Sequence, residues 1–141
     1  MKHIIIGTHG ELSKEFIETA KLIAGEDIKI RYLCMTKGKS VGEAEKEARN
    51  LLDSKHKYIV LTDVFCGSVC NLFTSLLNEY DFDLLTGVNL PMVLTTLLSN
   101  QSSTALVEEV VQESRNGIQY VNDLIKKEAG GDDLDDLFNE S

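Results

Sequence analysis

A histidine follows the first apolar run of this chain, in a position where its side chain could react. Residues 3–7 read as a strand, and Thr8-His9-Gly10 come before an amphipathic helix expected from Glu11 to Ala24. His9 therefore lies between the carboxyl end of a strand and the amino end of a helix, where open α/β sheets place their ligand sites. A neutral imidazole there offers a nitrogen lone pair to a proton, an alkylating group or a phosphoryl group.

Asp63 is the residue best placed to assist His9, because it follows another expected strand, residues 58–62. A carboxylate that accepts a hydrogen bond from one imidazole nitrogen fixes the tautomer and leaves the other lone pair free. It also stabilises the cation that forms when that nitrogen reacts. Gly10 and Gly67-Ser68 stand where helices begin, and helix amino termini attract anions. Together these residues predict a phosphoryl-accepting nucleophile; the alternative interpretation is a turn histidine and an unrelated helix-capping aspartate.

Strands and helices alternate along the chain, which predicts an α/β fold with a mainly parallel central sheet and helices on both faces. The remaining expected elements are strands at 28–34, 83–86 and 118–121 and helices at 40–52, 69–79, from Asn89 onward and 104–116. Asn89 is expected to cap its helix, with Pro91 in the first turn. Right-handed crossovers bring the carboxyl ends of parallel strands to one edge. We therefore expect Thr8-His9-Gly10, residues 63–71 and residues 87–89 to converge there.

The composition is that of one globular domain: of 141 residues, 43% are hydrophobic and 26% are charged. The formal net charge of −9 argues against nucleic acid as a partner, because phosphate backbones attract basic surfaces. Neither a membrane-spanning run nor a leader is expected, which favours a cytoplasmic location. We expect residues 1–127 to form the domain. The acidic segment 128–141, which has no basic residue, is expected to be a disordered tail.

The three cysteines, Cys34, Cys66 and Cys70, are expected to be free thiols, because their number is odd and nothing indicates secretion. The spacing of Cys66 and Cys70, with no histidine near them in sequence, argues against a metal site. No pattern implies a cofactor. The sequence has no GxxxxGK[ST] nucleotide loop, no GxGxxG after the first strand and no GxSxG nucleophile elbow.

Three motifs resemble those of the IIA domains of mannose-type sugar phosphotransferase systems (PTS). They are Thr8-His9-Gly10, Thr62-Asp63-Val64-Phe65-Cys66-Gly67-Ser68-Val69-Cys70-Asn71 and Gly87-Val88-Asn89-Leu90-Pro91-Met92, in the family's order and spacing. The resemblance covers residues 2–125. It implies that His9 is transiently phosphorylated at Nε2, that Asp63 orients it through Nδ1, and that Ser68 lines the phosphoryl site. The expected phosphoryl-binding residues are Gly10, Gly67 and Ser68, with Thr8, Asn71 and Asn89 in the neighbouring loops.

The same resemblance implies the partners. The phosphoryl donor would be the histidine-phosphorylated carrier protein HPr, and the acceptor would be a IIB domain that passes the group on for sugar uptake. The chain would meet the membrane permease only through the IIB, IIC and IID components. The resemblance also implies a homodimer in which the strand at 118–121 is exchanged between subunits.

Two positions depart from the family's Gly-Gly-Ser-Pro pattern, where Cys66 replaces the first glycine and Val69 replaces the proline. Cysteine loses the easy positive φ of glycine, and valine loses the preset helical turn of proline. Because His9 and Asp63 remain, we expect phosphorylation to survive.

Two other functions stay open: a regulatory module that senses phosphorylation without passing it on, and the phosphoryl donor subunit for dihydroxyacetone kinase. A histidine phosphatase is disfavoured, because Thr8 stands where that family has arginine.

Overall fold

Four parallel strands form the centre of the structure, a computed structural model that describes residues 2–128. The strands are β1 (His3–His9), β2 (Ile30–Met35), β3 (Tyr58–Thr62) and β4 (Phe82–Leu85). Their order in the sheet is β2-β1-β3-β4, so β1 and β3 are central and β4 is an edge. The expected α/β class with a parallel sheet is confirmed.

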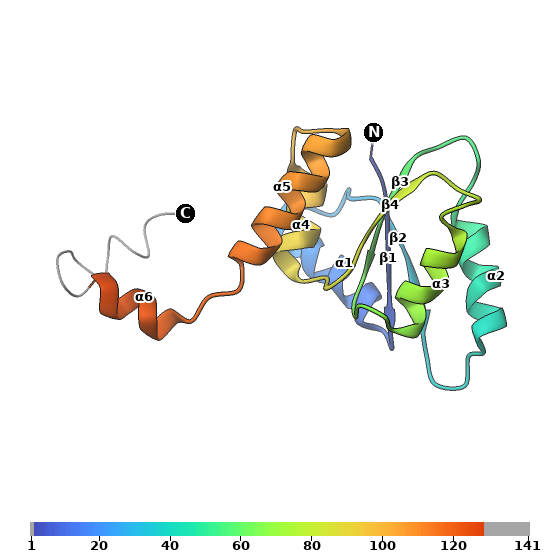
Figure 1. Ribbon diagram of the computed structural model, residues 1–141, viewed down its shortest axis with the longest axis horizontal. Coiled ribbons are helices and arrows are strands. Elements are labelled where there is room, and N and C mark those ends of the chain that lie inside the picture. Colours follow the sequence, from blue (N-terminus) through green and yellow to red (C-terminus); the bar gives the residue numbers. More distant parts are fainter. Residues whose placement is uncertain (1, 129–141) are drawn as a thin grey trace.

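Helices cover both faces of the sheet, as the alternation of elements predicts (Figure 1). The helices are α1 (Leu12–Ala24), α2 (Val41–Leu51), α3 (Ser68–Leu76), α4 (Leu90–Leu98), α5 (Ser103–Asn116) and α6 (Val121–Glu128). Side chains of α1, α4 and α5 pack on one face, and side chains of α2 and α3 pack on the other. The helix α6 lies apart from this three-layered body.

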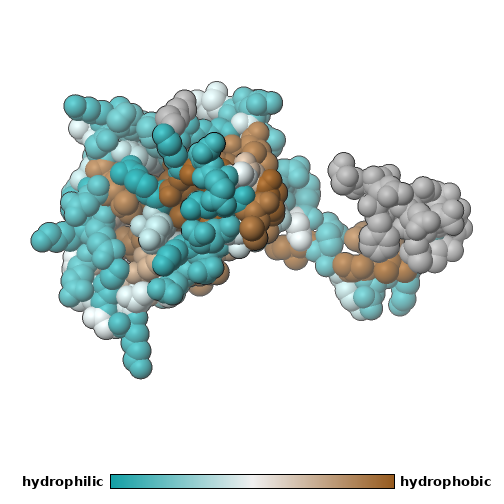
Figure 2. Space-filling model, turned by 180° about the vertical axis from the view of Figure 1, so that it is seen from behind, coloured by the Kyte–Doolittle hydropathy of each residue, from teal (hydrophilic) through white to brown (hydrophobic). Residues whose placement is uncertain are grey.

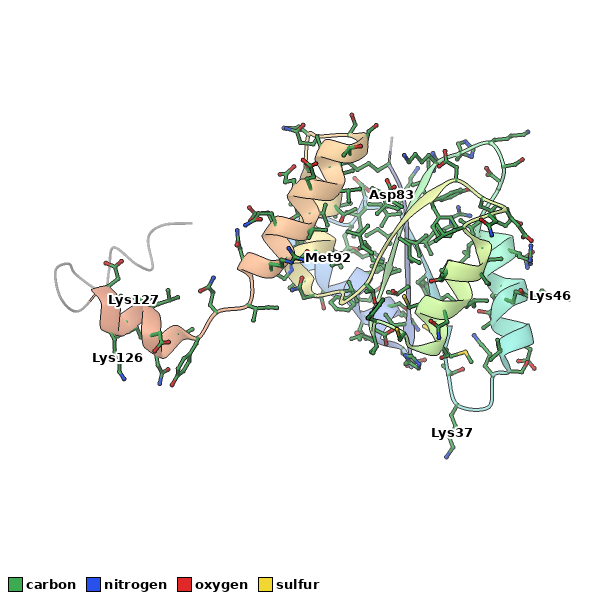
Figure 3. All side chains as sticks on the ribbon, in the orientation of Figure 1. Lys37, Lys46, Asp83, Met92, Lys126 and Lys127 are labelled. Atoms are coloured by element: carbon green, nitrogen blue, oxygen red, sulfur yellow. The ribbon has the colours of Figure 1, made fainter. Side chains whose placement is uncertain are left out.

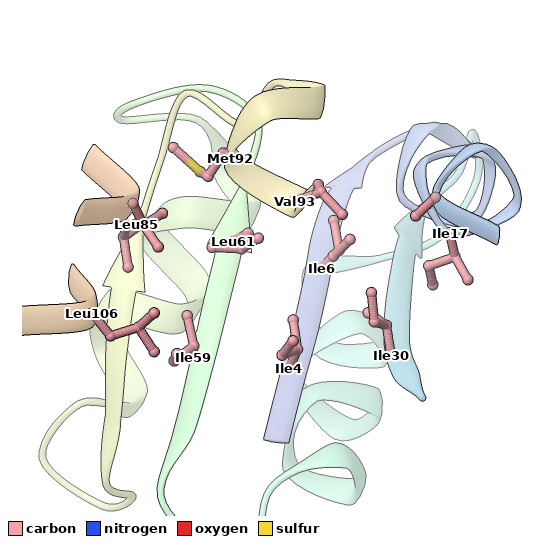
Figure 4. Packing of buried hydrophobic residues seen from close by; sticks show 12 residues of the cluster. Ile4, Ile6, Ile17, Ile30, Ile59, Leu61, Leu85, Met92, Val93 and Leu106 are labelled. Atoms are coloured by element: carbon pink, nitrogen blue, oxygen red, sulfur yellow. The ribbon is translucent and has the colours of Figure 1, made fainter. Parts of the chain in front are cut away.

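The apolar side chains of β1 contribute to two hydrophobic cores, one on each face of the sheet. Ile4 and Ile6 belong to the cluster under α1, α4 and α5, whereas Ile5 belongs to the cluster under α2 and α3. Figure 4 shows the first cluster, in which Val93 of α4 packs near Ile6. A central parallel strand is buried on both faces, which explains why apolar residues follow one another here instead of alternating with polar ones. Each such side chain contributes about 1.5–3 kcal/mol through burial.

A glycine in β1 lets α3 approach the strand that carries the histidine. A Cβ added at Gly7 would lie 2.9 Å from Cε2 of Phe73 and 3.0 Å from Cγ1 of Val69. Because those contacts are too close for a larger residue, glycine is required for this packing. Val69, which replaces the family's proline, is 1% exposed and serves as a core residue at the start of α3.

Local signals at helix ends act as the sequence predicts. The Ser40 side chain accepts a hydrogen bond from the Glu43 N–H at 3.1 Å and caps α2. Asn89 caps α4 by accepting from the Met92 N–H at 2.9 Å. Pro91 stands in the first turn of α4, where no intrahelical N–H is required.

The strand predicted at 118–121 is wrong for this structure. Residues 118–120 have no regular structure, and α6 begins at Val121. A strand needs a neighbour for its ladder, and within the described chain no strand pairs with this segment. Instead, the Ile118 N–H donates to the Arg115 carbonyl and the Leu124 N–H donates to the Tyr120 carbonyl.

The segment 118–120 leads away from the body to α6. Figure 2 shows apolar side chains on α6 and on the part of the body beside the connecting segment. Lys126 and Lys127 project from α6 (Figure 3). The expected acidic tail at 128–141 lies outside the described residues except for Glu128, which ends α6, so the tail stays a prediction.

Candidate functional site

The register of the two central strands brings His9 beside Asp63. Gly7 of β1 pairs with Thr62 of β3, so the chain positions just beyond this pair meet at the carboxyl edge of the sheet. One carboxylate oxygen, Oδ2 of Asp63, accepts the His9 backbone N–H at 2.9 Å and lies 3.0 Å from the ring Nδ1. This double contact sets both the backbone and the ring of His9.

Ser68 contacts the other side of the imidazole ring. Its Oγ lies 3.0 Å from Nε2 of His9. Because an ionised carboxylate only accepts hydrogen bonds, its contact with Nδ1 assigns the proton to Nδ1. Nε2 then carries the lone pair and accepts from the Ser68 hydroxyl. The structure therefore brings His9, Asp63 and Ser68 together, as the sequence predicts, and the lone pair of Nε2 lies on the side of the ring that faces Ser68.

Asp63 is held as a carboxylate. Burial raises its pKa, and its side chain is only 11% exposed. Hydrogen bonds from the His9 backbone N–H and ring, together with the positive charge that the ring carries when it is protonated, outweigh burial and lower the pKa of Asp63 below its ordinary value. The His9 side chain is 47% exposed, so the ring is open to a partner while its orienting group is sheltered.

The two glycines of the site have different roles: one leaves room for the His9 ring, and the other adopts a backbone conformation that favours glycine. A Cβ at Gly67 would lie 3.2 Å from Cε1 of His9, so glycine allows α3 to begin against the imidazole ring. Gly10 has φ of 58°, in the left-handed region that favours glycine. Their own N–H groups are already engaged, with Gly10 donating to the Met35 carbonyl at 2.8 Å and Gly67 to the Val64 carbonyl at 3.0 Å.

The first turn of α3 supplies other donors at this point. The opening N–H groups of a helix have no intrahelical acceptor, and in α3 they belong to Ser68, Val69 and Cys70. The positive end of the helix dipole lies at the same place. An anion on Nε2 of His9 would therefore meet this helix terminus. At the same edge of the sheet, the loop after β2 carries Lys37 at its tip (Figure 3).

Cys66 adopts a backbone conformation that is unusual for a residue with a side chain. Its φ is 63°, in the left-handed region. Asn71 supports this turn from α3, because its Nδ2 donates to the Cys66 carbonyl at 3.2 Å. The loop thus accommodates cysteine without separating Asp63 and Ser68 from His9.

Thr8 and Ser13 form a buried connection behind the histidine. The Oγ1 of Thr8 accepts the Ser13 N–H at 2.7 Å, and the Ser13 hydroxyl donates to the Leu33 carbonyl at 2.9 Å. This connection holds the start of α1 against β1 and β2. The sequence analysis missed Ser13; a polar residue on the inner side of the first helical turn was the signal that could have found it.

Asn89 has a structural role in the described chain. Besides capping α4, its Nδ2 donates to the Ser114 carbonyl of α5 at 2.9 Å. It follows β4, which is separated from β1 by β3. Asn89 therefore joins two helices at the sheet edge, and no described hydrogen bond links it to His9.

Three further observations concern residues 2–128. The cysteines Cys34, Cys66 and Cys70 are free, as the sequence predicts. Within this part of the chain, no group of three or more histidine, cysteine, aspartate or glutamate side chains is arranged to hold a metal ion. No helix among these residues has the length and apolar character needed to span a membrane.

The fold and the site define an α/β protein with a carboxylate-oriented histidine at the carboxyl edge of a parallel sheet. Sequence comparison places it in a family. The profile of the EIIA-man family, whose description reads PTS system fructose IIA component, matches residues 3–114. The chain belongs to this family, whose members are EIIA components of the sugar phosphotransferase system.

Individual relatives agree with this assignment. The mannose-specific EIIAB component of Escherichia coli K12 is 27% identical over 82% of this chain. The chain spans only 38% of that relative's length. The crystal structure of the phosphotransferase system component EIIA from Streptococcus agalactiae is 28% identical, with a TM-score of 0.79 over 86% of this chain and 98% of that one. The PTS IIA protein associated with the fucose utilization operon from Streptococcus pneumoniae is 28% identical, with a TM-score of 0.78 over 88% and 96%.

Proposed function

We propose that this chain is a cytoplasmic phosphocarrier that accepts a phosphoryl group from phosphorylated HPr on Nε2 of His9 and passes it to a IIB domain for sugar uptake. The observation that carries the proposal is the pair of 3.0 Å contacts on the imidazole ring, from Asp63 to Nδ1 and from Ser68 to Nε2. The first contact selects the tautomer with a lone pair on Nε2, and the second marks where the phosphoryl group would bind.

In the proposed step, the lone pair of Nε2 forms a bond to phosphorus. The bond between phosphorus and the donor's imidazole nitrogen breaks, and its electron pair stays on the donor ring, which leaves as a neutral imidazole. His9 becomes a cation that carries hydrogen on Nδ1 and the phosphoryl group on Nε2. The Asp63 carboxylate stabilises this cation. Because both donor and acceptor are imidazoles, the transfer is nearly balanced and reversible.

Catalysis in this scheme is positioning and charge stabilisation. The Ser68 hydroxyl turns from Nε2 to a phosphoryl oxygen, and the first N–H groups of α3 face the same oxygens. Gly10 and Gly67 contribute by shaping the turn and by allowing close approach to the ring. Thr8, Asn71 and Asn89 contribute by holding the surrounding elements.

The test is to incubate the protein with phosphoenolpyruvate, enzyme I and HPr and to measure its intact mass after an alkaline quench. We expect one acid-labile phosphoryl group on the wild type and none on His9→Ala. Failure of the wild type to gain the group contradicts the proposal, as does an adduct that persists in His9→Ala. Label that loads on His9 but never moves to a cognate IIB domain would favour the regulatory alternative.

We propose in addition that the chain forms a homodimer through residues 118–121. Four observations support this assembly. The edge of β4 is open within the described chain, and a cavity of about 370 Å³ lies between β4 and α5. The Oγ1 of Thr86, which lines this cavity, is buried and has no hydrogen-bond partner in the described structure. Ile118 and Tyr120 are 77% and 66% exposed. An exchanged segment would cover the cavity and these two side chains.

Light scattering after size-exclusion chromatography tests the dimer. Ile118→Asp is expected to shift the wild-type dimer toward monomer, because it places a charge in the covered surface. Leu22→Asp is the matched control, since Leu22 is 84% exposed on α1. A wild-type monomer contradicts the proposed assembly, and equal mass for both variants contradicts the role of this segment.

A further inference from the structure

Basic side chains gather at the amino edge of the sheet, opposite to the candidate functional site. Lys2 precedes β1 and His3 opens it, while Lys29 precedes β2 and Arg31 is its second residue. Because Ile5 of β1 pairs with Arg31, the two parallel strands begin side by side. The four basic residues therefore lie together, in a chain whose formal net charge is −9.

A cavity of about 410 Å³ lies at these strand ends. The described residues that line it are Lys2, His3, Ile4, Lys29, Ile30 and Arg31. Four of them are basic, two are apolar, and none carries a carboxylate. The volume is within the range of small-molecule sites. The lining of this cavity therefore favours a small anion.

The cations of this cavity have little negative charge around them. In the part of the chain that the structure describes, Lys2, Lys29 and Arg31 form no ion pair with a carboxylate. The guanidinium carbon of Arg31 lies 5.6 Å from the centre of the Tyr58 ring, a cation–π contact that leaves its charge in place. Burial lowers the pKa of Lys2, and the charge of Glu109 offsets this only in part. A bound anion would balance this positive charge.

A second cavity, of about 760 Å³, adjoins the first, because both are lined by Lys2 and Lys29. Its lining also includes the apolar side chain of Leu97, the amide of Gln101 and the carboxylate of Asp27. A carboxylate repels an anion, so the negative group of a ligand is favoured in the first cavity. The second cavity suits an uncharged part that offers both carbon atoms and hydrogen-bonding groups.

We propose that the two adjoining cavities bind a small organic phosphate whose uncharged part carries hydroxyl groups. The phosphate occupies the first cavity, where Lys29 and Arg31 donate charge-assisted hydrogen bonds to its oxygens. The hydroxyl-bearing part extends into the second cavity, where the Gln101 amide can both donate and accept hydrogen bonds and Leu97 covers carbon atoms. This site is separate from the proposed phosphoryl transfer, because His9 lies at the other edge of the sheet.

The experiment titrates the full chain with glucose 6-phosphate at fixed ionic strength and follows the backbone N–H signals by NMR. Inorganic phosphate and glucose are titrated separately, because each supplies one part of the ligand. The variants are Arg31→Gln, Gln101→Ala and the control Lys46→Gln. All three side chains are exposed, so their replacement leaves the fold intact, and Lys46 projects from α2 (Figure 3).

Glucose 6-phosphate is expected to shift the signals of residues 2–5, 27–31 and 97–102 and to bind about tenfold more tightly than inorganic phosphate. Arg31→Gln is expected to weaken the binding of both phosphates about tenfold, since it removes a charge-assisted hydrogen bond. Gln101→Ala is expected to weaken the binding of glucose 6-phosphate alone. Lys46→Gln is expected to keep the wild-type Kd for both.

Each other result overturns the inference. Without saturable shifts at the amino edge there is no site, and shifts at residues 67–70 in their place assign the anion to the start of α3. Equal affinity for glucose 6-phosphate and inorganic phosphate removes the organic part of the ligand. An unchanged Kd in Arg31→Gln, or an equal loss in Lys46→Gln, shows that the cavity does not hold the phosphate. These results leave the loading of His9 from HPr untouched, so they are distinct from a failure of the proposed function.

Discussion

Replacing Asp63 with asparagine tests the central interaction of the site while preserving its shape. In the wild type, Oδ2 accepts the His9 N–H and faces Nδ1, and Oδ1 accepts the Val64 N–H at 3.0 Å. Asparagine has one oxygen and one NH₂ group, so its NH₂ must face a donor on one side or the other. The variant also lacks the negative charge that, under the proposed function, would stabilise a cationic, phosphorylated His9.

The size of the effect follows from the loss of a charge-assisted hydrogen bond. Such bonds contribute about 1.5–3 kcal/mol. Since about 1.4 kcal/mol corresponds to a tenfold change in rate, Asp63→Asn is expected to slow the loading of His9 by about 10- to 100-fold. The reduction should fall on the rate at saturating donor, because Asp63 is sheltered from the partner surface.

The chain offers a matched control in Asp53. This carboxylate makes the same kind of contact, 2.9 Å from its Oδ2 to Nδ1 of His56, and its Oδ1 accepts the Lys55 N–H at 2.9 Å. Asp53 precedes β3 and therefore lies at the opposite edge of the sheet from His9. Asp53→Asn is expected to load at the wild-type rate.

The assay is rapid-quench loading from phosphorylated HPr, with circular dichroism to establish that each variant is folded. A folded Asp63→Asn that loads at the wild-type rate refutes the reasoning. Slowing of both aspartate variants by the same factor would refute it too, because the effect would then not depend on contact with His9.

Three further predictions concern stability. Cys66→Gly is expected to have a free energy of unfolding up to about 1 kcal/mol above that of Cys66→Ala in urea titrations, because a Cβ at φ of 63° is strained; equal values would mean that the turn stores no strain. Gly7→Ala is expected to lower that free energy by about 1–3 kcal/mol, because the new Cβ would lie 2.9 Å from Phe73, and an unchanged thermal midpoint would contradict this packing. Because folding lowers the pKa of Asp63 below its ordinary value of 3.8, its carboxylate stabilises the fold above that pH and ceases to do so as the pH falls through the lowered value. The difference in unfolding free energy between wild type and Asp63→Asn should therefore shrink as the pH is lowered from above 3.8 to below it; a difference that grows with acid would be inconsistent with the lowered pKa.

Much of the site was predictable because the topology of a parallel sheet brings residues that follow different strands close together. His9 and Asp63 are 54 positions apart, yet each follows a strand, and parallel strands end at one edge. Ser68 was predictable as the first residue of a helix that faces the same edge. The roles of Gly10 and Gly67 were harder to predict from the sequence. Their N–H groups donate to the Met35 and Val64 carbonyls, and only the fold reveals those acceptors.

The strand predicted at 118–121 was wrong because its formation also depends on contacts that only the fold reveals. Alternating apolar residues favour a strand, but strand formation depends on a partner ladder that no local pattern specifies. In this structure the segment continues into α6, and whether it forms a strand depends on what covers the open edge of β4.

The amino-acid sequence by itself determined the class of fold, the buried strands and the position of His9 at the end of the first of them, because periodicity, capping residues and residue chemistry are local properties. Only the tertiary structure showed that one oxygen of Asp63 contacts both the backbone N–H and Nδ1 of His9, and that a left-handed turn at Cys66 keeps Ser68 against Nε2. It also decided that Phe65 faces solvent beside the site while Val69, four residues later, is core. Hydrogen-bond geometry and burial depend on distances between segments far apart in the chain, and those distances exist only once the strands have paired.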